Sequence, residues 1–165
     1  MIEQLRERLQ GKKTLILGIG NTLRGDDGLG PRLIERLQGK VAATLIDGGE
    51  VPENYLGPIE AAGAEVVLIV DAADLKAAAG DVALIELEQL GKTGISTHNA
   101  SLGLLASVVQ RLTGADVLAL AVQPKVNSFG AAMSEEVMKT LEGLEEMLST
   151  CLRAREQPGN RPAEE

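Results

Sequence analysis

Two adjacent carboxylates, Asp26 and Asp27, lie within a glycine-rich stretch that runs from Gly18 to Gly30. Adjacent carboxylates repel each other unless one of them meets a cation or backbone N–H groups. The stretch follows an apolar run and precedes a periodic apolar segment, so it is predicted to join a strand to a helix. A simpler interpretation makes one acid a helix cap and leaves the other solvated. The loop is otherwise expected to bind a ligand, either a metal ion or a phosphate.

Neither common phosphate-binding pattern is complete in this loop. In a Gly-x-Gly-x-x-Gly dinucleotide motif that begins at Gly18, the third glycine position holds Leu23. Asp47 could still mimic the ribose-binding acid of such proteins, so a nucleotide-dependent α/β enzyme stays open as an alternative. No Gly-Lys-Ser/Thr follows, as a P-loop requires, and two carboxylates beside a pyrophosphate would be electrostatically costly. The loop is therefore interpreted as one that presents carboxylates.

Three further polar side chains lie at the predicted ends of strands or the start of a helix. Asp47 and Asp71 follow apolar runs, and His98, the only histidine, lies where a loop turns into a helix. Sites in open α/β sheets lie beyond the carboxyl ends of the strands. Carboxylates and one imidazole suit a divalent transition metal that keeps positions open for water or substrate. Each residue also has a structural interpretation, because aspartates at strand ends often cap helices or hold turns.

Strands and helices alternate along the chain. Apolar runs predict strands over 14–19, 43–46, 65–70, 82–87 and 116–122. Periodic apolar residues predict helices over 1–9, 29–38, 52–62, 102–112 and 134–152. The pattern predicts an α/β fold, a three-layer αβα sandwich with a mainly parallel sheet of about five strands. The short connection into 82–87 predicts an antiparallel edge strand there.

The composition favours a single soluble domain. The 165 residues are 44% hydrophobic and 24% charged, with one Phe, one Tyr and no Trp. A formal charge of −8 and the shortage of aromatic residues argue against nucleic-acid binding. The single cysteine, Cys151, excludes an internal disulfide, and no signal peptide or membrane span is visible. We expect a cytoplasmic monomer with one domain over 1–152 and a flexible tail over 153–165.

The order of short motifs resembles the hydrogenase maturation endopeptidases, in particular the subgroup that processes formate-hydrogenlyase-type and F420-type hydrogenases. The matching residues are Gly18-x-Gly20-Asn21-x-Leu23-x-x-Asp26-Asp27-Gly28-x-Gly30, Asp47-Gly48-Gly49 with Pro52-Glu53-Asn54, Val70-Asp71-Ala72-x-Asp74, Thr97-His98-Asn99 and Gln123-Pro124. They occur in the same order over about residues 14 to 150. This ordered set is far more specific than any single motif.

The resemblance implies an endopeptidase, classed with the aspartic type, that removes a short C-terminal extension from the nickel-loaded large-subunit precursor of a [NiFe] hydrogenase. Carried over by position, the metal ligands of the family fall on Asp27, Asp71 and His98, which are also the expected catalytic residues. Nickel is expected to arrive with the precursor, and zinc or cadmium are alternative occupants of the same ligands. The metal either polarises the scissile carbonyl or serves only in docking, with one Asp as general base.

Four other residues are expected to contact these ligands or the substrate. They are Asn21, Asp26, Asp47 and Asn99. Within this set, Asp26 is expected to be held by local backbone groups while Asp27 points toward Asp71. A non-catalytic nickel-binding chaperone of the hydrogenase subunit would need the same ligands, so it stays open as an alternative to the endopeptidase.

Overall fold

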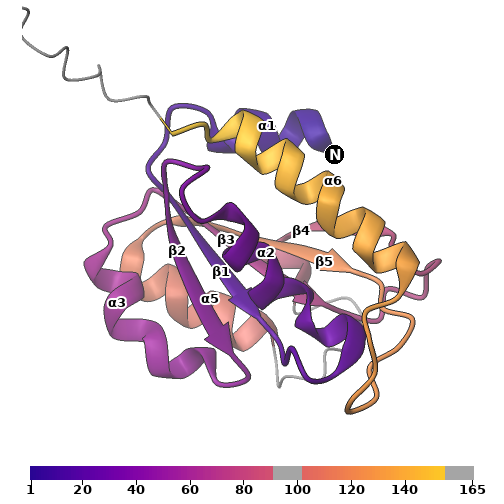
Figure 1. Cartoon of the computed structure of the whole chain (residues 1–165). Coiled ribbons are helices and arrows are strands. Elements are labelled where there is room, and N and C mark those ends of the chain that lie inside the picture. Colours follow the sequence, from indigo (N-terminus) through magenta and orange to yellow (C-terminus); the bar gives the residue numbers. More distant parts are fainter. Residues whose placement is uncertain (91–101, 155–165) are drawn as a thin grey trace, which may run out of the picture.

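A five-stranded sheet lies at the centre of the computed structural model, which describes residues 1–90 and 102–154 (Figure 1). Its strands are β1 (Thr14–Ile19), β2 (Ala43–Gly49), β3 (Val66–Ala72), β4 (Val82–Glu86) and β5 (Asp116–Val122). The spatial order is β2-β1-β3-β5-β4. All neighbouring pairs are parallel except β4 and β5, which are antiparallel. The predicted sandwich, its parallel sheet and the antiparallel edge strand are confirmed.

Helices cover both faces of the sheet. They are α1 (Ile2–Leu9), α2 (Leu29–Leu37), α3 (Leu56–Ala61), α4 (Leu87–Leu90), α5 (Leu102–Thr113) and α6 (Glu135–Cys151), with the 3₁₀ helices η1 (Gly25–Gly28) and η2 (Pro52–Tyr55). Apolar side chains of α1, α2 and α6 pack against one face, and those of α3, α4 and α5 pack against the other. No helix in the described ranges has the length and apolar character needed to cross a bilayer.

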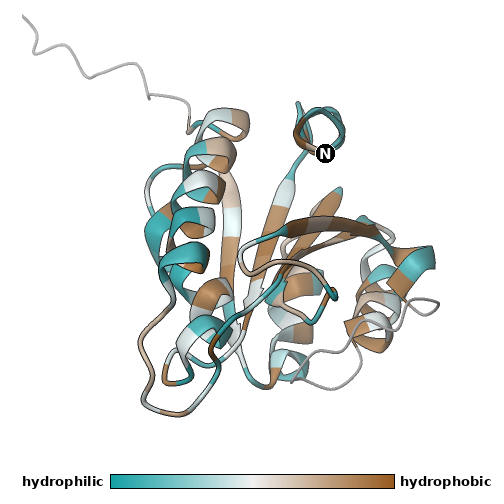
Figure 2. Ribbon diagram, turned by 90° about the vertical axis from the view of Figure 1, so that its right-hand side faces the viewer, coloured by the Kyte–Doolittle hydropathy of each residue, from teal (hydrophilic) through white to brown (hydrophobic). Residues whose placement is uncertain are grey.

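The central strands are buried on both faces, which explains their continuous apolar sequences. In β3, Leu68 and Val70 belong to the core cluster under α2 and α6, whereas Val67 and Ile69 belong to the cluster under α3 and α5. Figure 2 shows the hydrophobic colouring along these strands, with hydrophilic residues on the helices outside them. Side chains of alternate residues therefore serve two separate cores, as the twofold period of a strand requires.

Two strands extend further than the sequence predicted. Asp47, Gly48 and Gly49 follow the predicted strand 43–46 but belong to β2, because Gly18 pairs with Asp47 and Ile19 pairs with Gly49 across a register irregularity. Likewise β3 continues through Asp71, which pairs with Ala121 of β5. Backbone pairing with a neighbouring strand thus extends both strands beyond their predicted ends. The predicted strand 82–87 is one residue too long, because Leu87 begins the short helix α4.

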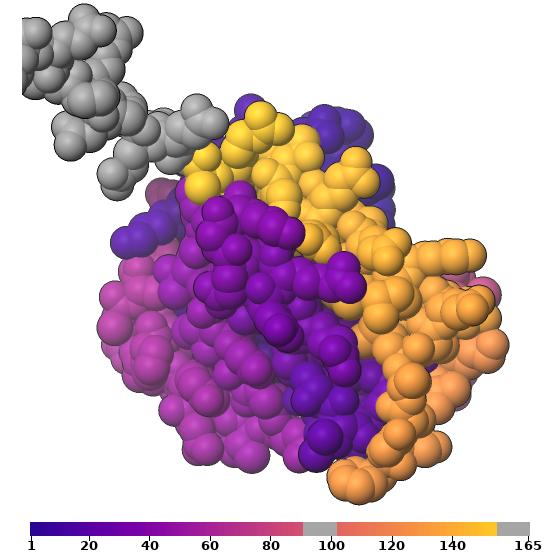
Figure 3. Space-filling view, viewed as in Figure 1, coloured from indigo at the N-terminus to yellow at the C-terminus, as the bar shows by residue number. Residues whose placement is uncertain are grey.

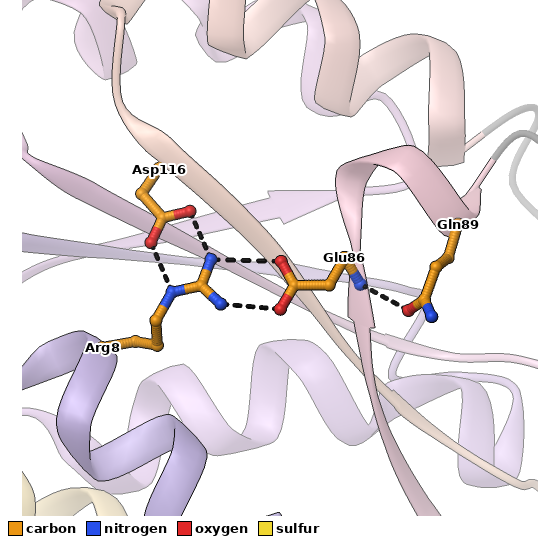
Figure 4. Close-up of polar contacts among 4 residues, drawn as sticks. All are labelled: Arg8, Glu86, Gln89 and Asp116. Atoms are coloured by element: carbon orange, nitrogen blue, oxygen red, sulfur yellow. Dashed lines mark hydrogen bonds and ion pairs between the residues drawn. The ribbon is translucent and has the colours of Figure 1, made fainter.

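Arg8 joins the first helix to two strands at the opposite edge of the sheet from the glycine-rich loop (Figure 4). Its Nε and Nη2 atoms donate to the Asp116 carboxylate at 2.7 and 2.6 Å. Its Nη1 and Nη2 atoms donate to the Glu86 carboxylate at 2.6 and 3.1 Å. Hydrogen bonds to Asp116 and then Glu86 raise the pKa of Arg8, and the same guanidinium lowers the pKa of Asp116. The first helix is therefore fixed to the start of β5 and the end of β4.

The end of α6 returns to the chain just before β2. The Ala42 N–H donates to the Leu152 carbonyl at 2.6 Å, and Val41 forms an isolated antiparallel bridge with Arg153. The paired chain therefore continues beyond residue 152, where the tail was expected to begin. The remaining tail residues, 155–165, lie outside the described ranges.

Candidate functional site

Asp71 is a buried carboxyl group near the carboxyl end of the central strand β3. Its residue is 1% exposed, and neither carboxyl oxygen has a hydrogen-bond partner among the described residues. Burial raises its pKa well above the ordinary value, and the charge of Asp27 raises it further, opposed only by the neighbouring Ala72 backbone N–H. Buried polar groups are ordinarily paired. An unpaired carboxyl group in this position points to a ligand that completes its contacts.

Asp27 approaches from the loop that follows β1. It lies in η1, is 3% exposed, and accepts a hydrogen bond at Oδ2 from the Asn21 N–H at 2.9 Å. Its own N–H donates to the Arg24 carbonyl at 3.0 Å. The Asp27 side chain is thus held by a hydrogen bond from Asn21, which belongs to the same loop. The structure brings Asp27 within electrostatic reach of Asp71, as the sequence predicted.

Two glycines permit this close approach. Gly20 has a φ of +143°, and a Cβ atom there would lie 1.8 Å from the Asp27 carbonyl oxygen. At Gly30, in the first turn of α2, a Cβ atom would lie 2.4 Å from the Ile19 carbonyl oxygen and 2.7 Å from that of Val70. Any side chain at either position would push η1 and α2 away from the ends of β1 and β3. The glycines therefore set the distance between the two carboxylates.

Asp26 does not face the same site but fastens the loop to a distant segment. Its Oδ2 atom accepts from the Lys125 N–H at 2.8 Å, from the Val126 N–H at 2.9 Å and from the Ser134 hydroxyl at 2.9 Å. Its Oδ1 atom accepts from the Ser134 N–H at 2.7 Å. The residue is fully buried. Backbone groups do hold Asp26, but they come from the β5–α6 connection about 100 residues away, so the expectation of local backbone partners is wrong.

Of the other residues that were expected to contact the ligands or the substrate, Asn21 lies in the loop after β1 and Asp47 lies on the surface. Asn21 takes part in the loop, because its N–H binds Asp27 and its Oδ1 atom accepts from the Leu23 N–H at 2.9 Å. Asp47 is exposed and accepts from the Gly49 N–H at 2.9 Å, so its described contact is that of a turn residue. His98 and Asn99 lie outside the described residues.

A pocket of about 240 Å³ opens beside Asp71. It is lined by Ile19, Glu50, Pro52, Glu53, Asp71, Leu102 and Leu105. Glu50 and Glu53 were not singled out from the sequence as site residues. Glu53 belongs to the Pro52-Glu53-Asn54 motif of the resemblance, and both residues closely follow the carboxyl end of β2, where sites in such sheets lie. The pocket is therefore lined by four apolar residues and three acidic residues.

The donor set fits a divalent cation in part. The charge of Asp27 raises the pKa of the buried Asp71 carboxyl group, and a cation beside the two groups would offset that charge. Within residues 1–90 and 102–154, no cluster of three or more histidine, cysteine, aspartate or glutamate side chains is arranged to hold a metal ion. The third predicted ligand, His98, belongs to the part of the chain outside those ranges. Two of the three ligands that the resemblance implies, Asp27 and Asp71, therefore lie within the described residues.

Comparison with known proteins gives a consistent result. A family model described as hydrogenase maturation protease matches residues 31–150. The hydrogenase 3 maturation protease of Escherichia coli strain K12 is 31% identical over 131 residues, which cover 78% of this chain and 83% of that protein. The crystal structure of a [NiFe] hydrogenase maturation protease HycI from Thermococcus kodakarensis KOD1 gives a TM-score of 0.82 at 32% identity, over 90% of this chain and 98% of the other. The solution structure of the Escherichia coli endopeptidase HycI gives 0.76 at 29% identity, over 84% and 90%.

Proposed function

Because the chain belongs to the hydrogenase maturation protease family, we propose that it is an endopeptidase that removes a short C-terminal extension from the nickel-loaded large-subunit precursor of a [NiFe] hydrogenase. The observation that supports this most strongly is the Asp71 carboxyl group, buried beside Asp27 without a hydrogen-bond partner in the described ranges and open to a pocket. A cation brought by the substrate would complete this arrangement.

In this proposal Asp27, Asp71 and His98 bind the nickel that the precursor carries. Nickel held there would supply a Lewis acid next to the scissile carbonyl. A precursor without metal could not complete the site, so it would bind poorly. Specificity for the loaded precursor then follows, because only that substrate brings a cation to Asp71, whose carboxyl oxygens have no hydrogen-bond partner in the described ranges.

The chain's own residues handle the proton of the attacking water. A carboxylate oxygen of Asp71 that does not bind the metal would be the general base. It can accept the proton of a water molecule that attacks the scissile carbonyl carbon, and return that proton to the leaving amine nitrogen. The bond between carbonyl carbon and amide nitrogen then breaks, with one water consumed. The same residue thus serves as base and then as acid.

The test mixes purified protein with nickel-loaded precursor and follows the mass of the precursor. We expect loss of the C-terminal peptide with wild type, and at least about 100-fold slower loss with Asp27→Asn, Asp71→Asn or His98→Ala. Asp47→Asn is the matched control, because its carboxylate lies on the surface, and it should process the precursor at nearly the wild-type rate. Circular dichroism shows whether each variant is folded.

Three results would change the proposal. Full processing by a folded Asp27→Asn or Asp71→Asn variant would remove that residue from the catalytic role. Equal processing of nickel-free precursor would show that nickel is not needed. Tight binding of loaded precursor with no mass change would replace the endopeptidase with a non-catalytic nickel-binding chaperone.

A further inference from the structure

Large apolar side chains are exposed at the edge of the molecule that carries the candidate site. Eight such side chains are exposed among the described residues, and four of them follow the carboxyl ends of β1, β2 and β5. These four form the apolar rim: Leu23, Val51, Tyr55 and Phe129, which are 59, 51, 38 and 70% exposed. The only phenylalanine and the only tyrosine of the chain both belong to it. Aromatic residues exposed next to a site mark a binding surface.

One side of the rim is built on the loops that hold Asp27. The Gly130 N–H donates to the Leu23 carbonyl at 2.7 Å, which joins the loop after β1 to the loop before α6. The four hydrogen bonds of Asp26 join the same two loops. Figure 3 shows these loops side by side at the lower edge of the molecule, one in indigo and the other in orange. Leu23 and Phe129 are therefore presented by a fixed support.

The other side of the rim borders the pocket. Val51 and Tyr55 lie next to Glu50, Pro52 and Glu53, which line the pocket together with Asp71. Pro52 is buried, so the base of this segment is anchored while its apolar side chains stay outside. The rim thus has members on the segment beside the pocket and on the loop that carries Asp27.

We propose that the apolar rim binds the folded body of the hydrogenase large-subunit precursor, so that the C-terminal segment to be cut reaches the pocket at Asp71. This rests on the proposed function. A protein substrate must be held by more than a metal and two carboxylates, because one peptide bond in a pocket of this size offers little surface. Exposed Leu23 and Phe129 add little to the core of their own chain, so their contribution comes on binding.

The experiment compares rim variants with variants of equally exposed apolar residues elsewhere. Phe129→Ala and Leu23→Ala are the test variants, with Val51→Ala and Tyr55→Ala for the other side. Ile2→Ala and Leu112→Ala are the controls, since these residues are 49 and 40% exposed in α1 and α5. Binding of nickel-loaded precursor is measured in the Asp27→Asn background, and processing in the wild-type background.

We expect Phe129→Ala and Leu23→Ala each to weaken binding about tenfold or more and to raise KM with kcat nearly unchanged. The controls should stay within about twofold, and the melting temperatures of all variants should match their backgrounds. Unchanged affinity in the rim variants would overturn the proposal. It would equally be overturned if those variants changed only the self-association of the protein, measured by sedimentation, because the rim would then bind a second copy.

The outcomes separate this proposal from the endopeptidase activity. If wild type cuts the precursor and rim variants cut it equally well at low substrate concentration, the activity stands and the docking surface is lost. If wild type never cuts the precursor but rim variants bind it more weakly than the controls do, the docking surface stands and the activity is lost.

Discussion

At the scale of single residues, Asp71 couples the proposed chemistry to the stability of the fold. An acid whose pKa is raised by folding binds its proton more tightly in the native state than in the unfolded chain. The metal-free protein therefore loses stability as pH rises from the unfolded value of about 3.9 through the raised native value. The carboxylate that would serve the substrate destabilises the free protein at neutral pH.

Asp71→Asn should remove this dependence. The free energy of unfolding of the variant, measured by urea denaturation without metal, should exceed that of wild type by an amount that grows as pH rises from about 4 to 8. The asparagine keeps the shape of the side chain but carries no charge, so repulsion from Asp27 is lost. Parallel stability curves for the two proteins would show that the native state does not raise the pKa of Asp71.

At the scale of elements, the Asp26 side chain joins the loop after β1 to the loop between β5 and α6. Its carboxylate accepts three backbone N–H groups and the Ser134 hydroxyl, and Ser134 also caps α6 through the Val137 N–H at 3.4 Å. This buried acid, together with the backbone hydrogen bond from the Asp26 N–H to the Val126 carbonyl, therefore holds η1 next to the start of α6. This explains why two adjacent aspartates occur: one fastens the loop, and the other faces Asp71.

Asp26→Asn should loosen this junction. An amide keeps one acceptor oxygen and turns an N–H₂ group toward donors, so we expect a loss of about 2–4 kcal/mol in the free energy of unfolding. Processing should slow as well, because Asp27 shares the loop. Asp47→Asn is the control, since its single bond to the Gly49 N–H is exposed and an asparagine oxygen can replace it; there we expect less than about 0.5 kcal/mol. If Asp26→Asn and Asp47→Asn lost equal amounts of unfolding free energy in urea denaturation, the Asp26 side chain would not stabilise the junction between the two loops.

At the scale of the whole molecule, the Arg8 cluster fixes the first helix to the far end of the sheet. Arg8→Ala should cost about 1–2 kcal/mol in urea denaturation at pH 7, a value reduced for the partial exposure of all three side chains. Because Arg8 lowers the pKa of Asp116, this contribution is present above the unfolded pKa of about 3.9 and is lost as pH falls through the native value.

The matched control for the Arg8 prediction lies two residues earlier in the same helix. Arg6 makes one exposed contact with Glu3 at 3.5 Å, so Arg6→Ala should change stability by less than about 0.5 kcal/mol. Processing should be unaffected in both variants at temperatures where they are folded, because the cluster lies at the opposite edge from Asp71. A deficit of Arg8→Ala that stays constant down to pH 3 would contradict the electrostatic account.

The sequence predicted most of the architecture because hydrophobic periodicity is a local signal. The strands 14–19 and 116–122 have the predicted bounds, and Ser134 caps α6 at the start of the predicted helix 134–152. Contacts between residues far apart in the sequence could not be predicted from this local signal. The hydrogen-bond partners of Asp26 follow β5, and the extension of β2 depends on an irregular pairing with β1. The meeting of Asp27 with Asp71 could be predicted from topology, because parallel strands end at a common edge.

The two core clusters differ in when they can form during synthesis on the ribosome. The cluster on the α3 and α5 side uses no residue beyond β5. The cluster on the other side needs Leu5 and Leu9 from the first helix and Val137 to Leu152 from the last. The part of this face that α6 covers therefore stays open until that helix has been synthesised. During that interval the nascent chain is open to aggregation and is a natural client for chaperones.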